Sequence, residues 1–281
     1  MAERVGARTG GFERRVIGAG RQLLFAMLAL SAADICAANS LAEAQALFYN
    51  GQYAAAAELT ETLSLEDGML AVHELRTSAL LFQIRRAIGE PRDKNKAFKE
   101  CVPCPALMAA FMEELGEGQA AARAILRERP KDEAALFFLG KLDLNYVWLV
   151  LGTLGRRTGW NEYWEARHSL DAVLVESPQH LRAAVARAWI DYIVDTKMPW
   201  GTGWVLGGGN RKRALAVMQQ AANGGDDFYA NAEALFGLWD MQVREKNFNA
   251  AMVPARRLAE LFPENPEIAR FIAVRSDASK H

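Results

Sequence analysis

The sequence predicts an all-α protein, a superhelix of helix pairs whose elongated central helices form a bundle. One pattern of aromatic, small and helix-breaking residues recurs three times, and no stretch alternates apolar and polar residues with the period of two that marks a strand. A third observation is the segment 144–154, LNYVWLVLGTL, in which only Asn145 is clearly polar. A helix that is apolar on every face is buried on every side.

The recurring pattern has an aromatic residue, an alanine three residues later, an apolar residue seven further on and a breaker after five more. The aromatic residue opens a helix, the alanine lets a neighbouring helix approach, and the glycine or proline ends it. Its copies are Tyr53, Ala56, Leu63 and Gly68; Tyr163, Ala166, Val173 and Pro178; and Phe248, Ala251, Leu258 and Pro263.

These residues resemble the tetratricopeptide repeat, a helix–turn–helix unit of about 34 residues. The resemblance covers residues 40–68, 117–188 and 226–266. It implies that the two helices of a unit touch at small residues, Gly140 in the first helix and Ala166 in the second. The interval from Pro130 to Pro178 is longer than one unit, and we expect the additional residues to lengthen a helix within 142–160.

We expect helices throughout the chain after residue 39, with turns at the glycines and prolines. The run Gly207–Arg213 is expected to form a turn and a helix cap at Asn210, with anion binding as the alternative. The expected helices span residues 40–49, 52–64, 68–88, 92–100, 105–115, 118–129, 132–155, 161–177, 180–195, 210–223, 226–245, 248–262 and 264–274.

The N-terminus has the three parts of a secretory signal peptide: an arginine-rich segment over residues 1–22, an apolar run at 23–33, and small residues up to Ala38. We expect cleavage after Ala38, which makes residues 1–38 the signal peptide and 39–281 a single helical domain in the periplasm. The apolar run is too short for a membrane anchor. Arg14 and Arg15 match a twin-arginine signal only loosely, and the residues before Cys36 do not fit a lipoprotein.

Charge and histidine content argue against two classes of protein. Removing residues 1–38 takes away five arginines and three acidic residues, so the net charge changes from −1 to about −3, which offers no basic excess for nucleic acid. The four histidines are scattered, and Glu165 with His168 is only half of what a di-iron bundle needs. We expect neither an enzyme nor a cofactor.

Two cysteines remain after cleavage, Cys101 and Cys104 in the sequence CVPCP. In an oxidising compartment a local disulfide is expected. Free thiols, a redox pair and a metal-binding pair stay open as alternatives, although a redox site of this spacing normally follows a strand.

The apolar segment 144–154 is either the core helix of the bundle or one wall of an apolar cavity. All seven tryptophans lie between residues 148 and 239, which indicates a wide interior or a binding surface in that half, with bulky core filling as the alternative. The candidate ligand-binding residues are Tyr146, Trp148, Leu149, Leu151, Trp189, Trp200 and Trp204.

Extended helices followed by a Gly-Gly turn and a short helix also resemble the T-component of tripartite (TRAP) transporters, over residues 105–275. The resemblance implies a non-catalytic periplasmic component that holds an apolar, lipid-like ligand in a bundle cavity for an envelope transport system. Its partner would be a periplasmic solute-binding protein or a transporter subunit. The alternative is an interaction scaffold whose repeats grip a partner peptide.

Overall fold

A computed structural model describes residues 41–63, 69–156, 158–197, 206–224 and 227–278. These residues form helices joined by turns, and none of them lies in a β-strand, so the all-α prediction is confirmed. The predicted signal peptide at 1–38 lies outside the described residues.

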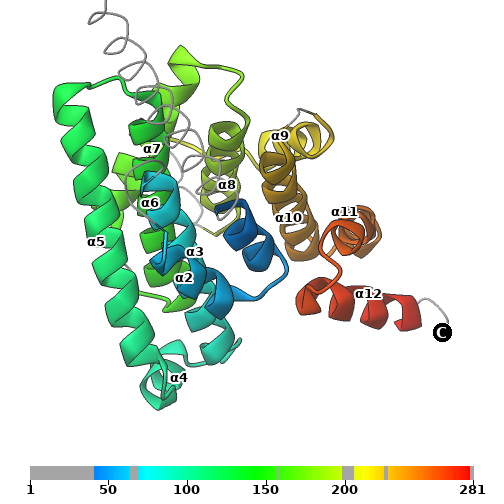
Figure 1. Ribbon diagram of the computed structural model, residues 1–281. Helices are drawn as coiled ribbons and strands as arrows, with labels where there is room; N and C mark the ends of the chain where they lie inside the picture. Colours follow the sequence, from blue (N-terminus) through cyan, green and yellow to red (C-terminus); the bar gives the residue numbers. More distant parts are fainter. Residues whose placement is uncertain (1–40, 64–68, 157, 198–205, 225–226, 279–281) are drawn as a thin grey trace, which may run out of the picture.

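The helices follow one another along the chain in pairs that pack side by side (Figure 1). Their bounds lie within a few residues of those expected, with one exception. A helix at 41–49 is followed by α2 (Tyr53–Glu61), α3 (Met69–Ile88), α4 (Lys94–Glu100), α5 (Cys104–Glu128), α6 (Glu133–Val147), the π-helix η1 (Trp148–Thr153), α7 (Trp160–Glu176), α8 (Leu181–Lys197), α9 (Arg211–Asn223), α10 (Phe228–Arg244), α11 (Phe248–Leu261) and α12 (Pro266–Ala278).

The exception is α5, which is a single helix where two were expected, at 105–115 and 118–129, so that prediction was wrong. The expected break at residues 116–117 is absent, and the helix runs through Gly116 and Gly118. A β-carbon on Gly118 would lie 2.9 Å from both His73 Cβ and Leu142 Cδ1. Close packing of α5 against α3 and α6 therefore requires a residue without a side chain, at a cost of about 1 kcal/mol in helix propensity.

Helix α6 continues directly into η1, and together they form the long central helix of the bundle. The span Glu133–Thr153 is the one described helix that is long and apolar enough to cross a membrane, and 56% of its most apolar stretch is buried inside the protein. Helices α3, α5 and α7 all pack against α6. The apolar surface of this helix is thus largely covered by its neighbours.

Helices α6 and α7 touch at the two small residues that the repeat pattern pairs. A β-carbon at Gly140 would lie 3.3 Å from the carbonyl oxygen of Ala166 and 2.9 Å from Leu170 Cγ. Ala166 is completely buried, as are Ala56 and Ala251 at the equivalent pattern positions. The close contact between α6 and α7 at Gly140 and Ala166 is therefore present. That the array is of the tetratricopeptide type stays a prediction.

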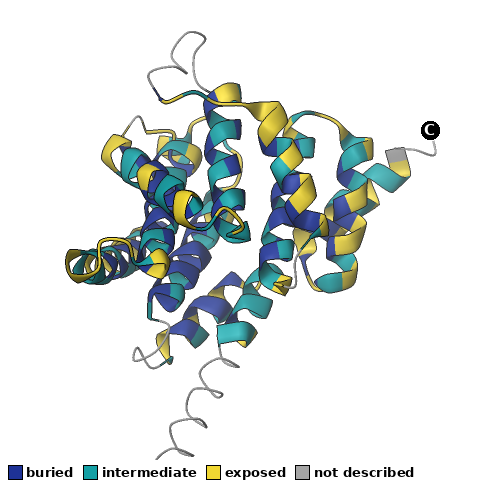
Figure 2. Ribbon diagram, turned by 90° about the horizontal axis from the view of Figure 1, so that it is seen from above, coloured by how far each residue is buried: buried dark blue, intermediate teal, exposed yellow. Residues whose placement is uncertain are grey.

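The first described helix lies against the last ones, so the two ends of the array meet. The Tyr49 ring stacks on Phe236 at a centroid distance of 5.5 Å. Asn265 Nδ2 donates to the Tyr49 carbonyl oxygen at 2.7 Å, and the Tyr229 hydroxyl donates to the carbonyl of Ala42 at the same distance. Seen from above, buried residues face the interior of the arrangement and exposed residues face outward (Figure 2). These contacts close the array around its interior.

A buried carboxyl group lies where α5, α6 and α7 meet. Asp143 on α6 is fully buried and accepts a hydrogen bond of 2.6 Å from Gln119 on α5. Burial raises the pKa of Asp143 to about 8, and the nearby carboxylate of Glu165 adds to the shift, against the opposing effects of Gln119 and Arg123. At neutral pH this carboxyl group is therefore mostly protonated.

Asn265→Ala should destabilise the closed array. The side chain donates to Tyr49 and accepts from the backbone N–H groups of Glu267 and Ile268, so its loss should cost on the order of 1–3 kcal/mol. The matched control is Asn247→Ala, which removes only an exposed helix cap and should cost about 1 kcal/mol. Thermal unfolding measures both, and equal melting temperatures would show that the contact between the ends contributes nothing.

Asp143 should make stability fall as pH rises. An aspartate ionises near pH 4 in the unfolded chain and near pH 8 here, so between these values the folded state holds a proton that the unfolded state lacks, and the free energy of unfolding decreases with pH. Asp143→Asn should remove this dependence. From pH 6 to pH 9, urea unfolding should show the wild type losing about 1–3 kcal/mol relative to the variant. Parallel pH profiles would contradict the assignment.

Candidate functional site

A cavity of about 270 Å³, partly open to solvent, lies between the helices of the array. The helix at 41–49 and helices α2, α3, α6, α8, α10 and α12 contribute side chains to its wall, as does η1. Aromatic rings make up much of the wall: Phe48, Tyr49, Tyr53, Phe82, Trp148, Trp189, Phe236 and Trp239. At about 30 Å³ for each water molecule in the liquid, the volume corresponds to about nine waters.

Each helix presents one stripe of residues to the cavity. Helix α6 and η1 supply Lys141, Leu144, Asn145 and Trp148, at offsets of three, four and seven residues. These offsets place side chains on one face of a helix. The same rule describes residues 182, 186 and 189 of α8, and residues 233, 236, 237, 240 and 244 of α10. Trp239 of α10 also lines the cavity, from beside this stripe.

The aromatic side chains contact one another across helices. Trp148 and Trp189 meet edge to face with ring centroids 5.5 Å apart, which joins η1 to α8. Tyr53 packs on Phe82 at 5.0 Å, which joins α2 to α3. Gly237 of α10 leaves room for Trp189, whose Nε1 would lie 3.2 Å from a β-carbon there. Aromatic pairs of this kind add about 0.5–1.5 kcal/mol each beyond the burial of their surface.

Four charged side chains that are 7–20% exposed also line the cavity, two of each sign. Lys141 hydrogen-bonds to Glu233 and lies 3.6 Å from Glu74. Arg182 lies 3.5 Å from Glu233 and 3.8 Å from Glu74. The polar part of the wall is thus an alternating set of cations and carboxylates.

Lys141 and Glu233 keep their charges although both are largely shielded from water. Burial alone would lower the pKa of Lys141, but the carboxylates of Glu233 and Glu74 outweigh it and raise that pKa. Burial alone would raise the pKa of Glu233, but Lys141 and Arg182 hold it below its usual range. Each charge is therefore stabilised by the other sign, and removal of one partner would leave an uncompensated charge in the interior.

Asn145, the polar residue of the apolar segment, belongs to a hydrogen-bonded seam between α3 and α6. Its Nδ2 donates to Ser78 Oγ at 3.0 Å and to Thr77 Oγ1 at 3.1 Å. Ser78 in turn donates to Glu74 Oε1 at 3.1 Å. The seam fixes Glu74 relative to the central helix, so it positions one of the charged groups of the cavity.

The structure brings two of the predicted ligand-binding residues together and leaves three others away from the described cavity wall. Trp148 and Trp189 line the cavity. Tyr146, Leu149 and Leu151 lie on other faces of the central helix; Leu149 is 1% exposed and belongs to the same apolar cluster as Phe111 and Leu142. The two remaining candidates, Trp200 and Trp204, lie outside the described residues.

Sequence reasoning missed the charged groups and the N-terminal aromatic residues of the cavity. Lys141 offered a detectable sign, because a lysine inside an otherwise apolar helix requires a buried partner or access to water. Phe48 and Tyr49 offered none, since the helix at 41–49 that carries them packs against α10 and the turn before α12. Tyr53 reaches the cavity because α2 packs on α3, where its ring contacts Phe82.

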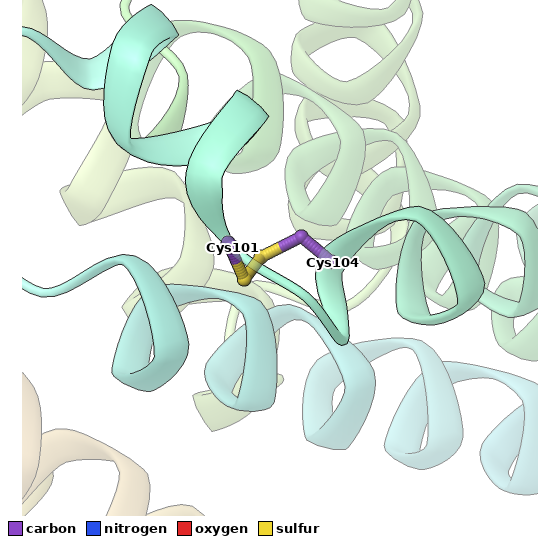
Figure 3. Close-up of a disulfide and its surroundings, with 2 residues drawn as sticks. All are labelled: Cys101 and Cys104. Carbon is purple, nitrogen blue, oxygen red and sulfur yellow. A yellow bond between two sulfur atoms is a disulfide. The ribbon is translucent and has the colours of Figure 1, made fainter.

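A disulfide joins Cys101 and Cys104, the residues expected to pair, and connects the end of α4 to the start of α5 (Figure 3). Helix α4 in turn contacts η1, because Lys94 Nζ donates to the carbonyl oxygen of Gly152 at 2.5 Å. A β-carbon on Gly152 would lie 3.0 Å from the Trp148 ring. The bridge therefore holds a helix that supports the end of η1 next to Trp148.

Two other groups of possible metal ligands form contacts with neighbouring side chains. His73, Glu114 and Glu117 have ligand atoms within 4.8 Å of one another, but His73 hydrogen-bonds to Glu114, and Arg76 Nε lies 3.1 Å from the second oxygen of that carboxylate. Glu165 pairs with Arg123, and the His168 ring stacks on Trp164 at 5.6 Å.

The glycine-rich run after the undescribed segment 198–205 forms the expected turn and cap. Asn210 Oδ1 accepts from the N–H of Arg213 at 2.8 Å and caps α9. Arg167 of α7 donates to the carbonyl oxygens of Leu206 and Gly207 at 3.1 and 2.6 Å. The guanidinium of Arg167 therefore binds the carbonyl groups of this turn.

Comparison with known proteins finds no match among family models, curated protein sequences or solved structures. The cavity is therefore characterised by its geometry alone. Helices surround it, aromatic rings form much of its wall, and the charges of its wall are balanced.

Proposed function

We propose that this protein is a non-catalytic binding component that holds a small, largely apolar ligand in the central cavity, in the service of an envelope transport system. The observation that carries the proposal is the convergence of eight aromatic side chains from separate helices on one interior space. Small-molecule sites are concave, mostly apolar and largely pre-formed, with a few polar groups that fix orientation. The cavity has each of these properties.

The volume limits what the cavity can enclose. A space of about 270 Å³, equivalent to about nine waters, accommodates a ligand of roughly ten non-hydrogen atoms. The lipid-like ligand expected from the sequence must then be compact, or must leave most of its chain outside. A single ring fits both the volume and the aromatic wall.

Closure of the array supports a small molecule over a peptide. A scaffold of helical repeats binds peptides along an open concave surface. Here the helix at 41–49 lies across that surface, with Tyr49 stacked on Phe236 of α10 and tilted against Phe262 at 5.2 Å. The alternative function as a peptide scaffold would require these contacts to separate.

A compact neutral ring should bind to the cavity. We expect 2-phenylethanol to saturate one site in isothermal titration calorimetry. At a hundredfold excess over its dissociation constant it should raise the melting temperature by roughly 5–10 °C. No heat of binding and no shift in melting temperature would show that the cavity does not hold a neutral ring by itself, and would contradict the apolar ligand of this proposal.

Substitutions on α8 test the location of the site. Ala186 is buried and lines the cavity, so Ala186→Phe should fill the space and abolish 2-phenylethanol binding. Ala184 lies on the same helix outside the cavity wall, and Ala184→Phe is the matched control, which should bind as the wild type does. Circular dichroism establishes that both variants are folded, and equal binding by both would place the site elsewhere.

The proposal includes a periplasmic location for the protein, which can be tested separately from ligand binding. The N-terminal sequence pattern predicts that the exported protein begins at Asn39. Mass spectrometry of protein isolated from the cell envelope should find this terminus. An acylated Cys36 or an intact residue 1 would contradict it.

A further inference from the structure

The charges around the cavity are balanced. Four acidic and four basic side chains are among the described residues of the wall, so its net charge is zero: Glu74, Glu233, Asp240 and Glu267 against Arg85, Lys141, Arg182 and Arg244. A ligand with a net charge would enter a buried site with no excess of the opposite sign to compensate it. A neutral or zwitterionic ligand avoids that cost.

Within this set, Glu74 and Arg182 form only long ion pairs with their charged neighbours, although Glu74 Oε1 also accepts a hydrogen bond of 3.1 Å from Ser78. Charge-assisted hydrogen bonds between N–H and carboxylate oxygen are about 2.7–2.9 Å long. Arg182 lies 3.5 Å from Glu233 and 3.8 Å from Glu74, and Glu74 lies 3.6 Å from Lys141. By contrast, Lys141 and Glu233 are directly hydrogen-bonded. Arg182 and Glu74 therefore retain capacity for a further partner, since a guanidinium carries five donors.

The spacing of these two groups suits a particular chemistry. A carboxylate and a guanidinium 3.8 Å apart can bind an ammonium group and a carboxylate that are attached to one carbon atom. The guanidinium can donate two parallel hydrogen bonds to the ligand carboxylate. The ligand ammonium would then approach Glu74, and its remaining substituent would face the rings of Trp148 and Trp189, which line the same cavity.

We propose that the ligand is an α-amino acid, or another zwitterion of that size, with an aromatic or apolar side chain. Its charged end binds between Arg182 and Glu74, and its side chain occupies the aromatic part of the cavity. The inference rests on the proposed binding function and names the class of ligand.

A series of ligands with the same ring tests the class. The probes are L-phenylalanine, the cation phenethylamine, the anion 3-phenylpropionate and the neutral 2-phenylethanol. In calorimetric titrations of the full-length mature protein, we expect L-phenylalanine to bind at least tenfold more tightly than any of the other three. If 2-phenylethanol binds as tightly as L-phenylalanine, the zwitterion inference is wrong while the binding function stands. If none of the four binds, the binding function itself fails.

Neutral variants locate the charged end. Glu74→Gln and Arg182→Gln should each weaken L-phenylalanine binding at least tenfold and change 2-phenylethanol binding less than twofold. The matched control is Glu267→Gln, which removes the charge of a half-exposed carboxylate of the same wall and should change L-phenylalanine binding less than twofold. Equal effects of all three variants would overturn the assignment. Circular dichroism establishes folding, and if a variant does not fold, the wild-type ligand series alone decides the class.

Discussion

The contact between the first described helix and the turn before α12 is the constraint on which the rest of the described structure depends. Tyr49 and Asn265 are separated by more than two hundred residues, yet one hydrogen bond of 2.7 Å joins them directly. Without this contact the helix at 41–49 would not lie over α10, and one side of the aromatic wall would be absent. Such a pairing forms only after the intervening helices have packed, because closing so long a loop costs conformational entropy that local contacts must offset first.

A second constraint is the electrical neutrality of the interior. Charged groups are costly to bury unless they are paired, and the cavity resolves this by bringing Lys141, Arg182, Glu74 and Glu233 from four different helices to one place. Each of these charges can be accommodated in the interior only because groups of the opposite sign lie beside it. The arrangement therefore ties the relative positions of α3, α6, α8 and α10 to one another more specifically than apolar packing would.

Local sequence patterns predicted most helices because their causes are local. Asn210 precedes α9 and caps it, and Ala166 is small where α7 meets α6. The errors and omissions have non-local causes. A break was predicted at residues 116–117, but α5 runs through them because it packs against α3 and α6, with His73 and Leu142 close to Gly118. The apolar segment 144–154 was predicted to be either a core helix or a cavity wall. Which of its faces meets the cavity depends on the neighbouring helices. In the structure Trp148 lines the cavity, whereas Leu149 lies in an apolar cluster of the core.

The polar residues of the central helix have an effect beyond the cavity. By length and composition, Glu133–Thr153 could remain in a lipid bilayer. Asp143 lies at the middle of this span and Lys141 two residues before it, and each would cost about 2.5–3.5 kcal/mol at the centre of a membrane helix. Lys141, which brings a charge to the cavity wall, and Asp143, which brings a carboxyl group into the core, thus also oppose retention of the helix in lipid. The same few residues let a very apolar helix belong to a folded interior instead of a bilayer.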